Sequence, residues 1–254
     1  HDRPEGYRFS VKIAIFGMGY VGTTAAACLA DRGHTIIGIE TNPLKVTALN
    51  EGRSPIEEPG LGDLIAAARA QDRLSAATEI GDRLDDCDVA MVCVGTPSGI
   101  DGAHAMSAIM NVTHQLAAAI RPERRADLGK GLLTLVYRST MAPGTYENLI
   151  WPIIAAHLGE EAGQTVELVY NPEFMREGSA IADFHAPPKI VIGTPDARHS
   201  AQLAKLNEGI SGPVFEVGLR EAEMTKFVDN AWHAAKVAFA NEIGRVCQQL
   251  GVSA

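Results

Sequence analysis

The stretch that decides the fold runs from Ile13 to Gly22 and reads IAIFGMGYVG. Its glycines, Gly17, Gly19 and Gly22, follow an apolar, β-rich run and precede a run of small residues that is typical of a helix. In such a loop the first glycine permits a tight turn, the second lets the backbone approach a phosphate, and the third lets helix and strand pack closely. The N–H groups at the start of the helix are free to bind an anion. The stretch therefore predicts a dinucleotide site.

An acidic residue favours this prediction over the alternative of a glycine turn without a ligand. Glu40 ends a second apolar strand that begins at Thr35, about 20 residues beyond the glycines. A carboxylate at that position accepts hydrogen bonds from ribose hydroxyls and disfavours a 2′-phosphate, so NAD is preferred over NADP. Lys45 is near enough in sequence to reach the adenosine ribose.

The composition limits the classes of partner. The chain has 254 residues, 46% of them apolar, which is enough for a large core. The formal net charge of −9 argues against nucleic acid or an anionic membrane as the main partner. No apolar run approaches the roughly 20 residues of a membrane span. Cys28, Cys87, Cys93 and Cys247 have no metal or disulfide spacing, so we expect buried small side chains in a reducing cytoplasm and no metal.

Apolar strands and helical segments alternate along the chain. We expect strands over Val11–Phe16, Thr35–Glu40, Val89–Val94, Leu132–Tyr137, Val166–Tyr170, Ile190–Ile192 and Val214–Val217. We expect helices over Gly22–Arg32, Asn42–Glu51, Leu61–Gln71 and Arg220–Leu250. This alternation predicts an α/β fold with a doubly wound, mostly parallel sheet of the Rossmann type, followed by a long C-terminal helix. The expected organisation is a tail over residues 1–10, a cofactor-binding domain over 11–219, and a long helix over 220–254 that begins a middle domain.

Polar residues follow three of these strands, at the edge where ligands of such a sheet bind. Gly95 and Thr96 follow one strand, and Ser139 and Thr140 follow another. Small and hydroxyl residues at this edge leave room for a nicotinamide ribose; the alternative is an ordinary exit from a strand. The segment 171–180 follows the third strand and carries two carboxylates, at positions 173 and 177. One of them could act as a general base on water, whereas the alternative is a solvated helix start, which also favours Glu.

Several motifs together resemble the UDP-glucose/GDP-mannose dehydrogenase family. They are the glycine loop 17–22 and the segments Ser54–Leu61, Val94–Pro97, Arg138–Thr140, Pro143–Thr145 and Asn171–Glu177. The resemblance extends from about Val11 to the end of the chain. Within the family, Trp232–Gly244 is most similar to the members that act on GDP-mannose, in the alginate pathway.

The resemblance implies that the C6 alcohol of a sugar nucleotide is oxidised to a carboxylate with two NAD and no released aldehyde. A cysteine thiolate traps the aldehyde, and water hydrolyses the resulting thioester. Thr140 is then expected to position the reacting water or sugar oxygen, and Glu173 to be the acid–base residue. Lys226 and Asn230, four residues apart on one predicted helix, are expected to stabilise an oxyanion. For the helix alone, the alternative is a solvated lysine.

The resemblance also assigns residues to the two ligands. The expected cofactor-binding residues are Gly17, Met18, Gly19, Tyr20, Val21, Glu40, Lys45, Val94, Gly95, Thr96, Ser139, Thr140 and Glu177. The expected substrate-binding residues are Glu173, Phe174, Met175, Arg176, Glu177, Lys226, Asn230 and His233.

The chain departs from the family in one important respect. The family's nucleophilic cysteine and its second Rossmann-like domain are expected beyond Ala254, and Cys247 does not match the cysteine motif. We therefore expect an N-terminal portion of a longer enzyme that is inactive or impaired by itself. Smaller departures are Met175, Gly178, and Glu40 where the family more often has Asp.

Alternatives to oxidation of GDP-mannose stay open at this point. The substrate could be a UDP-sugar, such as UDP-glucose or UDP-N-acetylmannosamine. The reaction could be a two-electron oxidation of the β-hydroxyacid type, or the chain could be a non-catalytic module that binds NAD or forms dimers. The last predicted helix is apolar over more than one face, so we expect a homodimer through it. The alternative is that a further domain buries this face.

Overall fold

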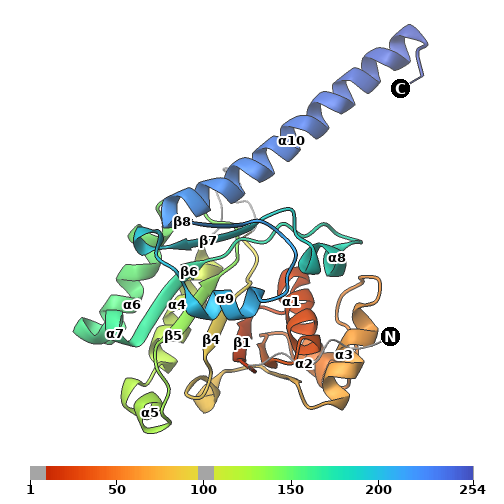
Figure 1. Ribbon diagram of the computed structural model, residues 1–254. Helices are drawn as coiled ribbons and strands as arrows, with labels where there is room; N and C mark the ends of the chain where they lie inside the picture. The colour runs from red at the N-terminus through yellow and green to blue at the C-terminus, as the bar shows by residue number, and fades with distance from the viewer. Residues whose placement is uncertain (1–9, 97–105, 254) are drawn as a thin grey trace.

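The computed structural model describes residues 10–96 and 106–253, which form one eight-stranded sheet (Figure 1). The strands are β1 Lys12–Phe16, β2 Thr35–Ile39, β3 Leu74–Ala77, β4 Val89–Val92, β5 Leu133–Tyr137, β6 Val166–Tyr170, β7 Ile190–Thr194 and β8 Val214–Gly218. Their order in the sheet is β3-β2-β1-β4-β5-β6-β7-β8. Residues 1–9 of the expected tail, Pro97 and Ala254 lie outside the described residues.

The sheet is parallel from β3 through to β6, and β7 pairs antiparallel to β6 before β8 pairs parallel to β7. The chain reverses its direction of winding between β1 and β4, which are neighbours in the sheet. Parallel sheets bind their ligands in the crevice at such a point. The predicted Rossmann-type fold is therefore confirmed, and its reversal point lies at the glycine loop that follows β1.

Helices cover both faces of the sheet. They are α1 Tyr20–Asp31, α2 Pro43–Asn50, α3 Leu61–Ala70, α4 Ser107–Ala119, α5 Pro122–Asp127, α6 Trp151–Leu158, α7 Ala162–Thr165, α8 Ala180–His185, α9 Ala201–Asn207 and α10 Leu219–Leu250. Short 3-10 turns span Gly81–Leu84, Gly159–Glu161 and Pro195–Ala197, and a π-type turn over Tyr146–Ile150 leads into α6.

A hydrophobic core lies on each face of the sheet, and the alternation of side chains along β1 shows why. Ile13 and Ile15 point to the face covered by α1, α3, α8 and α9, whereas Ala14 and Phe16 point to the face covered by α4 and α6. Successive side chains of a strand point to opposite faces, so a strand that is apolar at every position is buried on both. All four of these side chains are at most 2% exposed.

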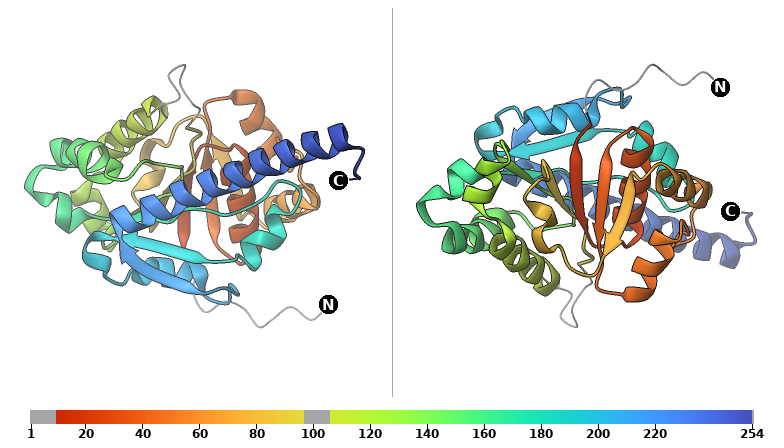
Figure 2. Two further views of the ribbon diagram at one scale, coloured as in Figure 1. Left: turned by 90° about the horizontal axis from the view of Figure 1, so that it is seen from above. Right: turned by 90° about the horizontal axis from the view of Figure 1, so that it is seen from below.

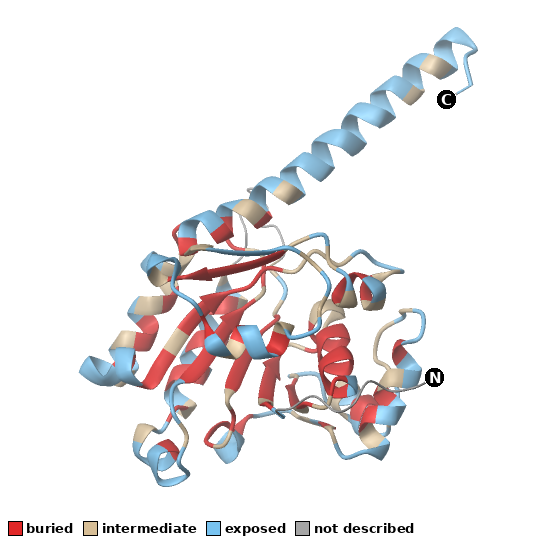
Figure 3. Cartoon of the chain, viewed as in Figure 1, coloured by how far each residue is buried: buried red, intermediate tan, exposed pale blue. Residues whose placement is uncertain are grey.

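The helix α10 has 32 residues and leaves the body of the protein after its second turn. Leu219, Ala222, Glu223 and Lys226 are buried, and no residue from Phe227 to Ser253 is. Figures 1 and 3 show this exposed part projecting from the body, and in Figure 2 its end lies beyond the body when seen from above. No helix of the described residues is both long enough and apolar enough to span a membrane.

The burial of each cysteine depends on whether it lies in the body of the protein or on the projecting part of α10. Cys28, Cys87 and Cys93 are buried, as predicted, and none forms a disulfide. The prediction was wrong for Cys247, which is half-buried. The reason is its place on the projecting part of α10, where the body of the protein offers no core to receive it.

Candidate active site

The glycine loop connects β1 to α1, and each glycine has a steric reason to be there. Gly17 has a φ of +90°, a conformation that side chains disfavour. A Cβ on Gly22 would lie 1.9 Å from the carbonyl oxygen of Gly17, so no larger residue fits at that position. A Cβ on Gly19 would meet nothing within 4 Å, because this residue borders a cavity.

This cavity has a volume of about 1010 Å³ and lies at the reversal point of the sheet. The glycine loop and Glu40 form one side of it, and Asn111, Gln115 and Arg121 form another. Its size matches the upper range of small-molecule sites, roughly 1,000 Å³. The cavity therefore has the size and place that a dinucleotide needs, with the N-terminus of α1 available for its phosphates.

The Glu40 carboxylate is fixed beside the glycine loop. One of its oxygens accepts a hydrogen bond from the N–H of Met18 at 3.1 Å, and the other accepts from the N–H of Asn42 at 3.0 Å. Lys45 Nζ lies 3.6 Å from it. Arg121, a second cation among the described residues that line the cavity, pairs with Asp82 and Asp85. Both cations are thus neutralised by carboxylates, which suits a cofactor without a 2′-phosphate.

The two polar strand exits are hydrogen bonded to each other. The Ser139 hydroxyl donates to the carbonyl of Val94 at 2.6 Å, and the Thr96 hydroxyl donates to the carbonyl of Thr140 at 3.2 Å. The parallel pairing of β4 and β5 brings these exits together. Four of the predicted site residues therefore form one cluster at the edge of the cofactor cavity.

The acid segment after β6 is held by α10. The Lys226 ammonium donates to the carbonyl oxygen of Glu173 at 2.6 Å and to its Oε1 at 3.1 Å, while Glu173 Oε2 accepts from the N–H of Met175 at 2.8 Å. The side chains of Lys226 and Glu173 are 8% and 13% exposed. The Phe174 ring lies 4.2 Å from Lys189 Nζ and 5.2 Å from Lys226 Nζ. A carboxylate and an ammonium thus meet at the ligand edge of the sheet.

Other predicted substrate residues differ in their surroundings. The Arg176 guanidinium forms a two-point pair with Asp183, at 3.0 and 2.8 Å, so this charge is already neutralised. Glu177 is exposed and has no hydrogen-bond partner among the described residues. Asn230 and His233 are exposed on the projecting part of α10, and neither contacts Glu173 through a hydrogen bond within the described part of the chain. Lys226 is buried whereas Asn230 is exposed, so the two side chains do not lie together on a buried face.

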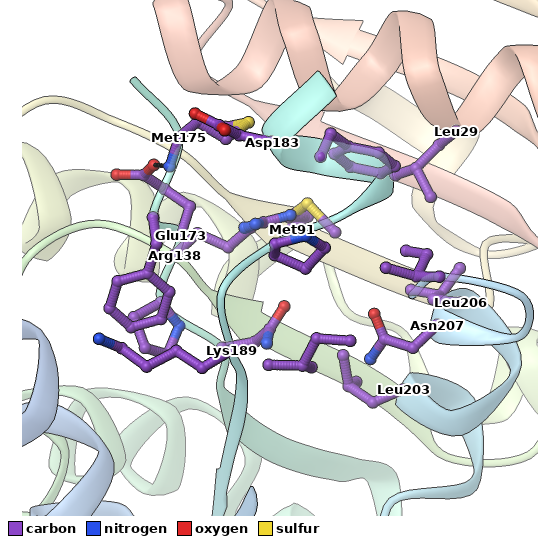
Figure 4. A pocket seen from close by; sticks show the side chains of 17 residues that line it. Leu29, Met91, Arg138, Glu173, Met175, Asp183, Lys189, Leu203, Leu206 and Asn207 are labelled. Carbon is purple, nitrogen blue, oxygen red and sulfur yellow. Dashed lines mark hydrogen bonds between the residues drawn. The ribbon is translucent and has the colours of Figure 1, made fainter. Parts of the chain in front are cut away.

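A small cavity of about 50 Å³ lies behind Glu173. Figure 4 shows Glu173, Arg138 and Lys189 on one side of it and Leu203, Leu206 and Asn207 on another. Arg138 Nε and Asn207 Nδ2 are buried without a hydrogen-bond partner among the described residues. A cavity of this size with polar lining has room for water molecules.

Two acidic residues of the site were not predicted from the sequence. The Glu223 carboxylate, fully buried at the start of α10, accepts hydrogen bonds from the N–H groups of Gly144 at 2.6 Å and Tyr146 at 2.9 Å. Burial raises its pKa, and these two hydrogen bonds oppose the rise. The second is Glu58, in the loop 54–61, which contacts both the glycine loop and the acid segment. The signal for Glu223 was its place one turn before Lys226.

Side chains that could bind a metal ion do not cluster in the described part of the chain. Over residues 10–96 and 106–253, no group of three or more His, Cys, Asp or Glu side chains could hold a metal ion. The carboxylates of Glu40, Glu173 and Asp183 instead pair with lysine or arginine side chains.

Comparison with known proteins assigns the chain to a family. Residues 11–211 match the NAD binding domain of the UDP-glucose/GDP-mannose dehydrogenase family, and residues 220–254 match the central domain of that family. The chain belongs to this family. The predicted family and the predicted cofactor, NAD, are thereby confirmed, and the cavity beside the glycine loop is where the geometry accommodates that cofactor.

Relatives in this family include proteins named for different sugar nucleotides. The chain is 39% identical over 242 residues to the GDP-mannose 6-dehydrogenase of Azotobacter vinelandii, covering 95% of this chain and 54% of the relative. It is 35% identical over 247 residues to the UDP-glucose 6-dehydrogenase AglM of Haloferax volcanii, covering 95% and 56%. A crystal structure of a ternary complex of GDP-mannose dehydrogenase from Pseudomonas aeruginosa superposes with a TM-score of 0.88 at 40% identity, covering 95% and 54%. The chain spans about half the length of these relatives.

Proposed function

We propose that this chain is the NAD-binding part of a sugar-nucleotide 6-dehydrogenase that oxidises GDP-mannose to GDP-mannuronate, as a source of sugar acid for a polysaccharide such as alginate. The observation that carries the proposal is the contact between Lys226 and Glu173 at the ligand edge of an NAD-binding sheet. The GDP-mannose 6-dehydrogenase relatives, at 38–40% identity, support the choice of sugar nucleotide.

The overall reaction balances as a four-electron oxidation. A primary alcohol, two NAD⁺ and one water give a carboxylate, two NADH and three protons. NAD supplies the hydride acceptor for each of the two oxidations. Hydrolysis of the acyl intermediate requires a water-activating base. Glu173 supports that assignment because its carboxylate is mostly buried and because it follows β6, the sheet neighbour of the strand β5 that leads to Thr140.

Lys226 is suited to stabilise negative charge on the reacting oxygen. An ammonium has three N–H donors, and Glu173 accepts from it at two atoms. The third donor remains for an oxygen of the substrate. A donor that is fixed before the reaction stabilises a developing oxyanion more than a mobile one does, because no reorganisation is needed at the moment of charge formation. We propose that Lys226 supplies most of this stabilisation and that Asn230 adds to it when substrate is bound.

The thiolate that traps the aldehyde needs a reactive cysteine. Burial raises the pKa values of Cys28, Cys87 and Cys93 to about 12, so these thiols stay protonated at neutral pH. Cys247 lies on the projecting end of α10. We therefore assign the trapping thiolate to a part of the whole protein outside these 254 residues, and expect this chain alone to be inactive or impaired.

A UDP-sugar is the second candidate substrate, favoured by the UDP-glucose 6-dehydrogenase relative at 35% identity. A two-electron oxidation is less well supported, because it requires no hydrolytic base and leaves the buried contact between Glu173 and Lys226 without a chemical purpose. A module that binds NAD without catalysis would also make no use of that contact.

Calorimetric titration tests the proposal. NAD and then GDP-mannose or UDP-glucose are titrated into the wild-type chain, the Lys226→Met variant and the Lys236→Met variant. Lys236 lies on the projecting part of α10 and serves as the matched control. We expect NAD to bind all three proteins and GDP-mannose to bind the wild type and the control more tightly than it binds Lys226→Met. Failure of the wild type to bind NAD would overturn the proposal, and tighter binding of UDP-glucose would transfer it to the second substrate.

We further propose a cytoplasmic homodimer that forms through α10. Phe239, Ile243, Val246 and Leu250 are exposed and recur at intervals of four, three and four residues, which is the spacing of a coiled-coil seam. A second copy of the same helix offers the matching seam. Analytical ultracentrifugation should show a dimer at micromolar concentration and a monomer for Phe239→Lys. A monomeric wild type would instead support burial of this face by a further domain.

A further inference from the structure

Glu58 belongs to the loop 54–61 and joins two parts of the site that are far apart in sequence. Its Oε2 accepts hydrogen bonds from the hydroxyl of Tyr20 and from the N–H of Gly178, the latter at 2.8 Å. Its Oε1 accepts from the N–H of Ala180, also at 2.8 Å. Tyr20 is the first residue of α1 in the glycine loop, and Gly178 directly follows Glu177. One carboxylate thus holds the cofactor loop and the acid segment together.

The Tyr20 hydroxyl is suited to this contact. Burial and the hydrogen bond to Glu58 raise the pKa of Tyr20 to about 12, so the phenol keeps its proton and donates it. The same hydroxyl oxygen accepts a hydrogen bond from the N–H of Gly178 at 3.2 Å. Tyr20, Glu58 and Gly178 therefore form a closed set of three hydrogen bonds.

The rest of the acid segment is fixed by other groups. Lys226 holds Glu173, and Asp183 holds the side chain and the N–H of Arg176. Glu177 follows these fixed points, and its carboxylate has no hydrogen-bond partner among the described residues. The contact with Glu58 fixes the backbone directly after it. Glu58 thus holds the backbone on the C-terminal side of Glu177 at two N–H groups, those of Gly178 and Ala180.

We infer that Glu58 is a positioning residue that couples the cofactor loop to the acid segment, so that NAD bound at the start of α1 and a sugar nucleotide bound at 173–177 reinforce each other. This inference rests on the proposed function. The physical reason is that a ligand that immobilises one partner of a hydrogen-bonded set reduces the cost of ordering the other. Such coupling is reciprocal between the two ligands.

Substitutions in this set test the inference. Glu58→Gln replaces one carboxylate oxygen by an NH₂ group, which leaves a backbone N–H without an acceptor. Tyr20→Phe removes the hydroxyl and little else. Glu57→Gln is the matched control, because Glu57 is the adjacent residue, is exposed and has no hydrogen bond to a described residue. Two quantities are measured for each protein: the dissociation constant of NADH by fluorescence, and the hydrogen exchange of residues 176–182 with and without NADH.

We expect NADH to slow exchange of residues 176–182 in the wild type and in Glu57→Gln, and to do so much less in Glu58→Gln and Tyr20→Phe. NADH should bind the last two about threefold to tenfold more weakly, and the double variant should be no worse than Glu58→Gln, because both substitutions break one coupled set. If Glu58 only stabilised the local structure, its substitution would change hydrogen exchange in the absence of NADH and leave the dissociation constant of NADH unchanged, which would contradict the inference. NADH binding that does not alter exchange of this segment in the wild type overturns the coupling alone. Absence of NADH binding to the wild type overturns the proposed function as well.

Discussion

Glu223 and Lys226 lie one turn apart on α10 and hold two different loops of the site. Glu223 accepts hydrogen bonds from the N–H groups of Gly144 and Tyr146, just beyond the strand exit that contains Thr140. Lys226 donates to Glu173 in the acid segment. Residues three apart on a helix are neighbours on its surface, so the two loops share one rigid support. The buried base of α10 is thus a structural part of the site as well as the start of the projecting helix.

Replacement of Glu223 by Ala should destabilise the fold. The N–H group of Gly144 loses its acceptor in a buried place and that of Tyr146 in a partly buried one, and an unsatisfied buried group costs about 1–3 kcal/mol. We expect the free energy of unfolding in urea to fall by about 2–4 kcal/mol. The exposed Glu221→Ala variant is the control, with an expected loss of about 0.5 kcal/mol or less. Equal losses in the two variants would contradict a structural role for the Glu223 carboxylate.

Replacement of Lys226 by Met should remove catalysis more than binding of the cofactor. Loss of one fixed donor to an oxyanion typically lowers kcat about 100-fold to 1,000-fold. We expect a loss of this size in the enzyme that contains this chain, measured as NADH formed from GDP-mannose, with little change in affinity for NAD. Lys236→Met should retain the wild-type rate. Wild-type kcat in Lys226→Met would rule out the proposed role of the ammonium.

Replacement of Glu40 by Ser should weaken binding of NAD and relax discrimination against NADP. The carboxylate lies beside the glycine loop, where it can accept hydrogen bonds from ribose hydroxyls, and its removal leaves Lys45 without its carboxylate partner. We expect the dissociation constant of NAD to rise about tenfold, equivalent to about 1.4 kcal/mol, and the ratio of NADP to NAD affinity to increase. Calorimetry with both dinucleotides measures this, with the exposed Glu51→Gln as control. An unchanged ratio would argue against a ribose contact for Glu40.

The stability of the fold should decrease in mildly acidic solution because of His34. This side chain is 1% exposed, and burial lowers its pKa from 6.5 to about 4. Above pH 6.5 the imidazole is neutral in both the folded and the unfolded state, and between pH 6.5 and 4 only the unfolded state takes up the proton. Unfolding free energy should therefore fall by about 3 kcal/mol across this window as the pH is lowered.

Urea denaturation at several pH values checks this prediction. His34→Gln should flatten the slope between pH 6.5 and 4, whereas the exposed His157→Gln should not. Burial also lowers the pKa of His185, so part of the slope should persist in the His34 variant. A slope that is identical in His34→Gln and the wild type would show that another group controls the acid sensitivity.

Local patterns were enough to predict most of the sheet. β6 has the predicted bounds, and β1, β2 and β5 differ from their predicted bounds by one residue each. β3 was not predicted, because its four residues, Leu74–Ala77, include one buried side chain and show neither a continuous apolar run nor alternation. The antiparallel direction of β7 was not predicted either. Direction depends on the path by which the chain returns to the sheet, and no local pattern records that path.

The sequence by itself determined the glycine loop, the choice of NAD and the acid segment, because glycine geometry, strand periodicity and the chemistry of a ribose-binding carboxylate act over short stretches of chain. The tertiary structure decided which of two adjacent glutamates contacts the glycine loop and the acid segment. Glu57 is exposed, whereas Glu58 accepts a hydrogen bond from Gly178, 120 residues further along the chain. Glu223 likewise bonds Gly144 across 79 residues. Whether a glutamate finds a hydrogen-bond partner depends on how elements distant in sequence pack together. That packing follows from the complete fold.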